Sequence, residues 1–226
     1  MYNIFLQTVT NTTEVVSTTK TLNILELATK GGWIMIVLAL LGILVVYIFV
    51  ERYIAINKAL KQDTTVFMDR VKDCIHNSDL QGAKNICEAN NSPIGRMIGK
   101  GLARLGRPLN DINQAVENVG KMEISKMESG VSMLATVSNL APSIGFLGTV
   151  TGMVKAFFDM ANAGNNIDIQ LLSGGIYEAM VTTVGGLIVG LIASFLYSII
   201  VGRINKMVLI LESRTMEFMD LLHEPA

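Results

Sequence analysis

The sequence predicts an all-α integral membrane protein with three transmembrane helices, and three observations support this prediction. Half of the 226 residues are hydrophobic and 16% are charged, whereas charged residues make up about 25% of an average soluble domain. Three windows carry no charge at all, namely Trp33 to Val50, Ser129 to Val154 and Ala179 to Gly202. Each window reaches the roughly 18–20 residues that a helix needs to cross a bilayer.

The composition argues against several classes of function. The formal net charge of −1 gives no indication of nucleic acid as a partner. Cys74 and Cys87 lack companion ligand pairs, so we expect reduced thiols and neither a metal site nor a cofactor. His76 and His223 lie in polar surroundings and are interpreted as surface residues. Because the three windows hold no Ser/His, Cys/His or metal constellation, we do not expect an enzyme.

The chain begins with a polar segment and a first span. Residues 1–30 are rich in Thr and Asn and become amphipathic from Leu22 to Ala28. Since this start is not basic, we expect no cleaved signal peptide. The amphipathic piece is expected to lie along the membrane surface or, alternatively, to form the first turn of the next helix. Residues 31–53 are the first span, with Trp33 and Tyr53 where aromatic belts occur, and their bland composition predicts a lipid-facing, supporting helix.

The segment between the first two spans, residues 54–128, is polar and helical by its periodicity. It is therefore expected to form a helical domain outside the membrane. Ser78 with Gln81 predicts a capping box at one helix start. Ser92 before Pro93 predicts another, because proline is favoured at the first helical position.

The second and third spans are expected to be much longer than the membrane is thick. From Leu109 no helix breaker occurs until Pro142, so the second span, 129–160, should project into solvent on its N-terminal side. The third span, 171–203, has no stop either, and should continue over 204–226 as an amphipathic helix.

The basic residues predict the orientation of the chain. Lys and Arg follow the first span, precede the second and follow the third, whereas the connection 161–170 has none. Cytoplasmic loops carry the excess of Lys and Arg. We therefore expect 54–128 and the C-terminal segment 204–226 in the cytoplasm, with the N-terminal segment and the loop 161–170 outside.

Small residues follow one face of each arm of the hairpin that the second and third spans form. In the first arm they recur at steps of four, three, four and three, at Ser138, Pro142, Gly145, Thr149 and Gly152. In the second arm they recur every four residues, at Thr182, Gly186, Gly190, Ser194, Ser198 and Gly202. Small residues at this spacing let helix backbones approach closely. The expected helix-packing residues are therefore Pro142, Gly145, Gly152, Gly186 and Gly190, and the missing neighbours are other copies or another subunit.

Polar side chains of the two arms are expected to share a layer inside the membrane. Folding the hairpin near Asn165 places Thr149 beside Thr182 and Thr183, with Glu178 about 15 Å inside the outer end of its helix. Hydroxyls donate and accept hydrogen bonds and rotate freely, so this layer can hold water or a transient hydronium. The alternatives are a hydroxyl bonded only to its own helix and, for Glu178, a hydrogen bond that fixes helix packing.

At these residues the sequence resembles the MotA/TolQ/ExbB family of proton-channel subunits. The resemblance is carried by Leu140-Ala-Pro-Ser-Ile-Gly-Phe-Leu-Gly-Thr-Val-Thr-Gly-Met153 and, less specifically, by Ile176-Tyr-Glu-Ala-Met-Val-Thr-Thr-Val-Gly-Gly-Leu187. It covers most of the chain from about residue 30. Three spans with a cytoplasmic domain between the first two are similar to ExbB and TolQ, whereas MotA-type subunits have an additional span.

The resemblance implies a homo-pentamer in the bacterial inner membrane, around the transmembrane helices of a dimeric partner similar to ExbD or TolR. Thr149 and Thr183 match family threonines that face the partner's proton-carrying Asp, and Glu178 matches the family's acidic position in the third span. A TonB-like or TolA-like protein is a further candidate partner, and lipid surrounds the ring. The family's third-span proline is missing from Val189-Gly-Leu-Ile-Ala193, which leaves open whether this helix kinks as in relatives.

Two functions from different classes follow from these observations. The favoured one is a proton-channel or stator subunit that uses the proton motive force to energise its partner, in TonB-dependent transport or a Tol-like process. The alternative is a passive membrane scaffold that only holds the partner. The substitutions Glu178→Gln and Thr149→Val discriminate between them, because only the first hypothesis predicts intact assembly with lost energy transduction.

Overall fold

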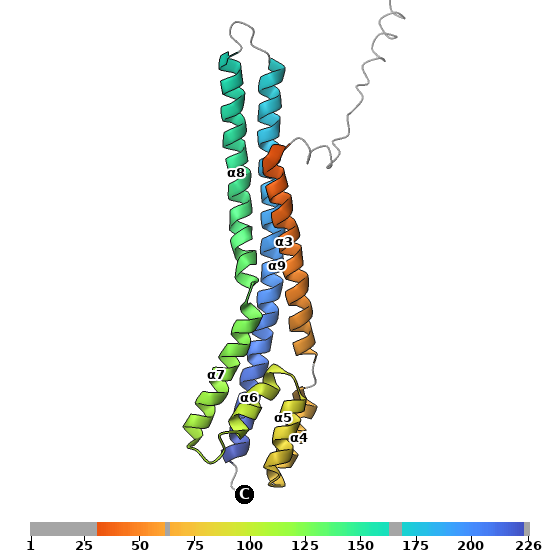
Figure 1. Cartoon of the computed structure of the whole chain (residues 1–226), viewed down its shortest axis with the longest axis vertical. Helices are drawn as coiled ribbons and strands as arrows, with labels where there is room; N and C mark the ends of the chain where they lie inside the picture. Colours follow the sequence, from red (N-terminus) through yellow and green to blue (C-terminus); the bar gives the residue numbers. More distant parts are fainter. Residues whose placement is uncertain (1–30, 62–63, 163–168, 224–226) are drawn as a thin grey trace, which may run out of the picture.

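The computed structural model describes residues 31–61, 64–162 and 169–223, and all regular structure in this part is helical. The helices are, in chain order, α3 (Gly32–Leu60), α4 (Thr64–His76), α5 (Leu80–Ala89), α6 (Pro93–Leu102), α7 (Leu109–Glu128), α8 (Val131–Asn162) and α9 (Ile169–His223). The amphipathic piece expected at 22–28 and most of the 161–170 loop lie outside the described residues. Helices α8, α9 and α3 form a long bundle, and α4 to α7 gather around the far end of α9 (Figure 1).

The prediction of an all-α protein with three candidate membrane spans is confirmed. Helix α3 has 29 residues, and both α9 and the combined stretch Leu109–Asn162 are long and apolar enough to cross a bilayer. Helix α9 runs unbroken for 55 residues, which corresponds to about 80 Å at 1.5 Å per residue. Since the hydrocarbon core is about 30 Å thick, a large part of α9 continues outside the membrane, as the sequence predicts.

One expectation about the second span is wrong. The helical pattern from Leu109 to Pro142 is not continuous, because α7 ends at Glu128, the following Ser129 has a ψ of 127°, and Gly130 has a φ of +79°. Glycine adopts this left-handed conformation without the steric cost that a side chain brings. The second long element is thus two helices joined at Ser129–Gly130. Pro142, by contrast, lies inside α8 without ending it.

The helix starts in the segment 64–102 agree with the sequence in one case and differ in the other. Ser92 caps α6 as predicted, and its hydroxyl accepts a hydrogen bond from the N–H of Gly95 at 2.9 Å. The cap of α5 is Asp79, which accepts from Gly82 N at 2.8 Å, and the expected capping box of Ser78 is wrong. A carboxylate one residue later competes successfully for the same orphan N–H groups.

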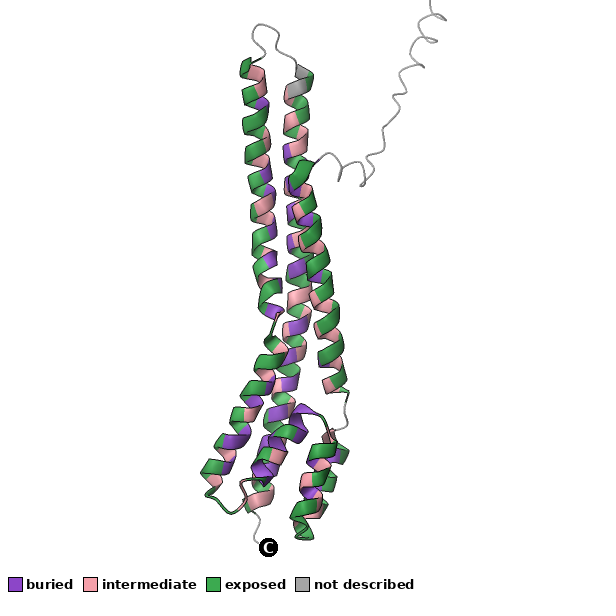
Figure 2. Cartoon of the chain, viewed as in Figure 1, coloured by how far each residue is buried: buried purple, intermediate pink, exposed green. Residues whose placement is uncertain are grey.

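Helix α9 takes part in two hydrophobic cores. One core fills the space between α3, α8 and α9, with Leu38, Leu134 and Ile200 among its fully buried side chains. The other joins α4, α5, α6 and α7 to the C-terminal part of α9, around Met68 and Phe218. Buried residues accordingly line the whole inner face of α9 (Figure 2). The helical domain is therefore packed directly onto the extension of the third span.

The outer surface of the membrane part is strongly apolar. On α3 the side chain of Trp33 is 72% exposed, and Ile43 and Tyr47 are similarly open. On the hairpin, Phe146 and Leu191 are exposed to a comparable extent. Contiguous apolar surface of this kind faces lipid or other protein chains. It agrees with the interpretation of α3 as a supporting helix that faces lipid.

Candidate functional site

Helices α8 and α9 approach each other closely, and glycines make the contact. A Cβ atom added to Gly145 would lie 2.8 Å from the carbonyl oxygen of Thr182 and 3.1 Å from the Cα of Gly186. A Cβ on Gly186 would lie 2.5 Å from the carbonyl oxygen of Ala141. These distances are shorter than side chains tolerate, so the two backbones touch only because both positions lack a side chain.

The contact extends along the helices on both sides of this crossing. Towards the helical domain, Pro142 packs over Gly190, where a Cβ would meet the proline ring at 2.6 Å. In the other direction, Gly152 faces Ala179, with a separation of 2.9 Å from a built Cβ to the alanine Cβ. All five glycine and proline positions singled out in the sequence thus lie in the α8–α9 contact.

The second half of the small-residue pattern on α9 does not take part. Ser194, Ser198 and Gly202 are exposed, and a Cβ on Gly202 would meet nothing within 4 Å. A step of four residues turns an ideal helix by about 400°, so each repeat drifts by about 40°. After three further steps the pattern has rotated off the α8 face.

Two threonines meet at the edge of the α8–α9 contact. The hydroxyls of Thr149 and Thr183 are hydrogen-bonded to each other, across the two helices. The Thr149 hydroxyl also lies 3.3 Å from the carbonyl oxygens of Gly145 and Ala179, and that of Thr183 lies 3.2 Å from Gly145 O. Each hydroxyl has a single proton to donate, and the other threonine's hydroxyl oxygen and the neighbouring carbonyl oxygens are alternative acceptors for it. The pair can therefore change its hydrogen-bond direction by rotation alone.

Thr182 has a different environment from the other two threonines. Its side chain is only 2% exposed, and it fills the space left by the missing side chain of Gly148. Its hydroxyl donates to the carbonyl of Ala179, one turn earlier in its own helix, at 2.7 Å. Thr149 and Thr183 are only half-buried. In the single chain, Thr182 is thus a buried packing residue, whereas the other two hydroxyls reach the surface.

Glu178 points away from the threonines and towards the first span. Its carboxylate lies directly against Gly32, the first residue of α3, which has a φ of +62°. Within the described part of the chain, no hydrogen bond joins the Glu178 carboxylate to the hydroxyl of Thr149, Thr182 or Thr183. A carboxylate at a helix N-terminus is favourably placed in the field of the helix dipole. The side chain thus links α9 to the start of α3.

A polar stripe on α8 was not recognised from the sequence. It consists of Ser132, Thr136, Asn139 and Ser143, which are all exposed although they fall within an uncharged, membrane-spanning window. Thr136 and Ser143 bond back to carbonyls one turn earlier, both at 3.0 Å. The spacing of four, three and four residues was the available indication of a common face. This face turns away from α9 and is open in the single chain.

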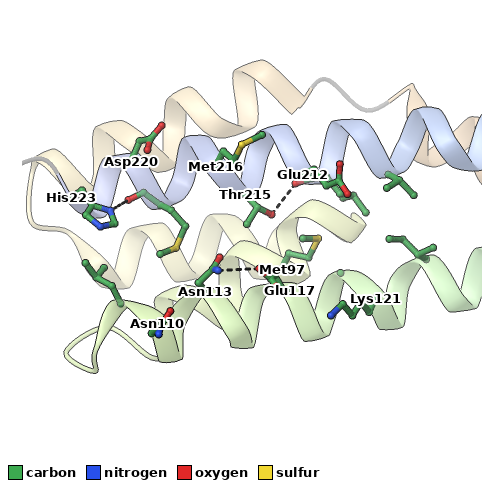
Figure 3. A pocket seen from close by; sticks show the side chains of 16 residues that line it. Met97, Asn110, Asn113, Glu117, Lys121, Glu212, Thr215, Met216, Asp220 and His223 are labelled. Carbon is green, nitrogen blue, oxygen red and sulfur yellow. Dashed lines mark hydrogen bonds between the residues drawn. The ribbon is translucent and has the colours of Figure 1, made fainter.

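A sizeable hollow lies outside the membrane bundle. It is a groove of about 870 Å³ between α7 and α9, where Met97, Met216 and Met219 meet charged side chains such as Glu117 and Asp220 (Figure 3). Its nearest lining residue on α9, Val208, lies 25 residues beyond Thr183 along the helix. The groove and the threonine pair are therefore separate features.

Comparisons with known proteins agree on one family. A sequence model of the MotA/TolQ/ExbB proton channel family matches residues 89–213, more than half of the chain. A biopolymer transport protein ExbB homolog of Methanothermobacter thermautotrophicus is 31% identical over 183 residues, which cover 80% of this chain and 64% of that protein. The ExbB-like 1 protein of Synechocystis sp. is 31% identical over 186 residues, or 81% of this chain and 72% of its own length.

A relative with another name matches the chain as well. The Tol-Pal system protein TolQ of Haemophilus influenzae is 34% identical over 104 residues, which cover 46% of this chain and 45% of that protein. This chain spans less than two thirds of the Methanothermobacter relative. The family match includes Gly145, Thr149 and Thr183 of the α8–α9 contact, and Glu178, which contacts the start of α3. The chain belongs to the MotA/TolQ/ExbB proton channel family.

Proposed function

We propose that this protein is the proton-channel subunit of an inner-membrane motor that works with an ExbD- or TolR-like partner. The observation that carries the proposal is the half-buried hydroxyl pair of Thr149 and Thr183, held between the uncharged stretches of α8 and α9. Polar groups inside a membrane are costly and are retained where they serve a pathway or a contact. The orientation proposed is the one that the basic residues indicate, with 54–128 and 204–226 in the cytoplasm and 1–30 and 161–170 in the periplasm.

The hydroxyl pair is suited to exchanging a proton with a carboxylate on a second chain. Each oxygen can accept while its proton rotates towards another acceptor, and the carbonyls of Gly145 and Ala179 lie within 3.3 Å. Neither hydroxyl is a strong base, so a partner carboxylate would be the group that takes up and releases the proton. Thr182 supports this arrangement by packing the helices, because its own hydroxyl is engaged with Ala179.

The exposed surface of the membrane bundle supports assembly into a ring. The polar stripe on α8 (Ser132, Thr136, Asn139 and Ser143) is open in the single chain, and exposing it to hydrocarbon is unfavourable. In a homo-pentamer this face can turn towards a wet interior or a neighbouring copy. We propose a pentamer around the single-span helices of a partner dimer, with the apolar face of α3 towards lipid.

Glu178 has a positioning role in this proposal. Its carboxylate contacts the start of α3 at Gly32, so it couples the supporting helix to the helix that carries Thr183. A displacement of α9 at the threonine layer would then move the start of α3, and a displacement of α3 would move this part of α9. This role belongs to Glu178 whether or not it exchanges protons itself.

The driving force is sufficient for mechanical work. One elementary charge that crosses 100 mV releases about 2.3 kcal/mol, and successive protons can move the partner dimer relative to the ring. The partner, or a TonB-like or TolA-like protein attached to it, then transmits this work across the envelope. The second candidate function, a passive scaffold, uses the same contacts but requires no proton exchange.

The test replaces Thr149 by Val, which keeps the shape of the side chain and removes the hydroxyl. Thr151→Val is the matched control, because Thr151 is on the same helix, exposed, and bonded only to the carbonyls of Leu147 and Gly148 in its own helix. Both variants are co-purified with the partner and reconstituted in vesicles, where proton flux is measured under an imposed potential.

The expected result is an intact complex for both variants, with proton flux lost only in Thr149→Val. Equal flux in Thr149→Val and the unmodified protein would leave the scaffold as the better explanation. Loss of assembly in Thr149→Val would show that the hydroxyl serves packing, which also contradicts the proposal.

A further inference from the structure

A cation-rich pocket lies where the membrane bundle meets the helical domain. It has a volume of about 320 Å³ and is formed by the end of α3, the start of α6 and the end of α7. Four cationic side chains line it, together with a single carboxylate, that of Glu123; the cations are Arg52, Lys58, Arg96 and Lys126. The formal charge of the lining is therefore +3, because one carboxylate does not balance four cationic side chains.

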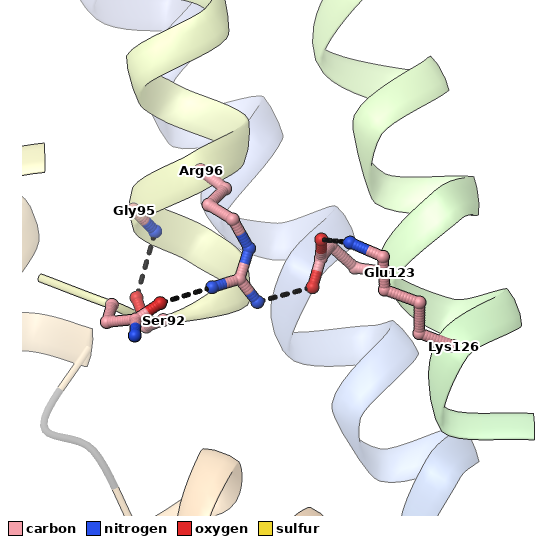
Figure 4. Close-up of polar contacts among 6 residues, drawn as sticks. Ser92, Gly95, Arg96, Glu123 and Lys126 are labelled. Atoms are coloured by element: carbon pink, nitrogen blue, oxygen red, sulfur yellow. Dashed lines mark hydrogen bonds and ion pairs between the residues drawn. The ribbon is translucent and has the colours of Figure 1, made fainter. Parts of the chain in front are cut away.

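Glu123 holds two of these cations in place. Its side chain is 5% exposed, and it accepts hydrogen bonds from Arg96 at 2.5 Å and from Lys126 at 2.8 Å (Figure 4). The hydrogen bond from Arg96, more than that from Lys126, lowers the pKa of the Glu123 carboxyl below its usual value. Arg96 also donates to the side chain of Asn91 at 2.8 Å. The two basic groups are thus pre-positioned at the pocket wall.

The other two cations have unused binding capacity. Arg52 donates to the carbonyl of Lys126 at 3.2 Å and lies 3.6 Å from the exposed Glu51, but its Nε–H is buried without a hydrogen-bond partner in the described residues. Burying an unsatisfied donor costs about 1–3 kcal/mol. Lys58 is exposed and forms no ion pair within the described part of the chain. An anion in the pocket could pair with the Lys58 ammonium and with the guanidinium charge of Arg52.

The pocket lies at the level of the lipid headgroups. The uncharged stretch of α3 ends at Val50, two residues before Arg52. From Trp33 to Val50 the helix covers about 27 Å, close to the roughly 30 Å of the hydrocarbon core. Arg52 also lies beside Gly130, 3.5 Å from a Cβ built there, within the second uncharged window, and α8 begins at the next residue. Two spans thus place the guanidinium where lipid phosphates lie.

We infer that this pocket binds the phosphate of an anionic phospholipid in the adjacent leaflet. Guanidinium groups bind phosphate oxygens through paired, charge-assisted hydrogen bonds; Arg52 lines the pocket, and Arg96, held by Glu123 and Asn91, adds its positive charge to the wall. The net charge of +3 favours a lipid with net negative charge over a zwitterionic one. Ala55, Ile56 and Met127 supply an apolar side to the pocket, against which the glycerol end of the lipid can pack. The site is independent of proton transfer, because it lies outside the threonine layer.

The test measures lipid binding to the full chain in neutral detergent micelles. Dioleoyl phosphatidylglycerol and dioleoyl phosphatidylcholine are titrated separately, and bound lipid is counted by native mass spectrometry. A third arm contains inorganic phosphate alone at millimolar concentration. The variants are Lys58→Gln, which removes an exposed charge without disturbing a contact, and the double variant with Arg52→Gln. The matched control is Lys206→Gln, an exposed lysine on α9 that does not line the pocket.

We expect phosphatidylglycerol to bind more tightly than phosphatidylcholine. Lys58→Gln should weaken its binding about fivefold, the contribution of one basic residue near anionic lipid, and the double variant about 25-fold. Lys206→Gln should have no effect, and inorganic phosphate should not displace the lipid. Equal affinity for the two lipids, or an equal loss in Lys206→Gln, would overturn the inference. Binding of inorganic phosphate that depends on Lys58, without lipid binding, would assign the pocket to a free anion and overturn the lipid as its ligand.

Discussion

Replacing Gly145 by Ala should loosen the α8–α9 contact, although alanine is the better helix former. The new Cβ would lie 2.8 Å from Thr182 O, 3.1 Å from Gly186 Cα and 3.2 Å from Thr183 Cα, all backbone atoms that cannot rotate away. Ordinary contact of a Cβ begins at 3.4 Å, so the two helices must separate by about half an ångström at this point. Overpacking of this kind costs about 1–3 kcal/mol.

The matched control is Gly202→Ala in α9, where a Cβ would meet nothing within 4 Å. There alanine should stabilise the helix by up to about 1 kcal/mol, the usual difference in helix propensity. The two variants have the same chemical change, so their difference isolates the helix contact. Unfolding is followed by circular dichroism in mixed micelles with increasing SDS, and the unfolding equilibrium constants are compared.

The expected outcome is a Gly145→Ala unfolding constant larger than that of Gly202→Ala by a factor of about 5 to 160, because the gain in helix propensity is common to both variants and the overpacking cost of about 1–3 kcal/mol remains. Because the Thr149–Thr183 hydrogen bond sits in the same contact, proton flux should fall together with stability. A Gly145→Ala protein as stable as the control would refute the close backbone approach, and with it the geometry proposed for the hydroxyl pair.

Three further predictions concern the helical domain. The pKa of the Glu123 carboxyl is lowered on folding. Its contribution to stability is therefore present above the ordinary carboxyl pKa and is lost as the pH falls from there through the lowered pKa of the folded state. The free energy of unfolding, measured between pH 6 and pH 3, should accordingly fall less in Glu123→Gln than in the unmodified protein. Burial raises the pKa of the Cys87 thiol to about 11, whereas Cys74 is only half-buried. Iodoacetamide at pH 8 should therefore alkylate Cys74 well before Cys87, and peptide mass spectrometry can follow both reactions. Equal alkylation rates would contradict the burial of Cys87. Phe218→Ala should destabilise the domain by about 3–5 kcal/mol, because this ring is fully buried, and thermal unfolding that remains unchanged would contradict the packing of α9 into the domain.

The sequence was sufficient for features that depend on neighbours along the chain. Uncharged windows gave the three spans, and the spacing of small residues found Gly145, Gly186 and Gly190, because one helix face can be read from periodicity alone. The joint at Ser129–Gly130 was overlooked although glycine after a helix is a common stop. It falls at the start of an uncharged window, where the hydrophobic pattern suggests continuation.

Features that depend on distant parts of the chain could not be predicted in the same way. The contact of Glu178 with Gly32 requires the relative height of α3 and α9, and no local pattern contains that register. The same holds for the pocket around Arg52, whose wall comes from α3, α6 and α7. In both cases the sequence shows a charged residue near the end of a span, Glu178 or Arg52. The residue that it contacts, Gly32 or Lys126, is more than 40 positions away along the chain.

The continuity of α9 connects the membrane site to the helical domain. Thr183 lies near one end of this helix and Phe218 near the other, and no proline or break separates them. Helix α9 contributes side chains to both hydrophobic cores. Ile200 packs in the core of the membrane bundle, and Met207, Leu211 and Phe218 pack in the core of the domain. Packed cores resist small deformations, so a shift of α9 at the hydroxyl layer must displace the domain as a unit or bend the helix between the cores. The joint at Ser129–Gly130 gives α8 the freedom that α9 lacks, because α7 can remain packed in the domain while α8 tilts. Under the proposed function, a proton-driven movement should separate into a tilting α8 and a rigid α9, with the crossing at Gly145 and Gly186 as the point about which they turn.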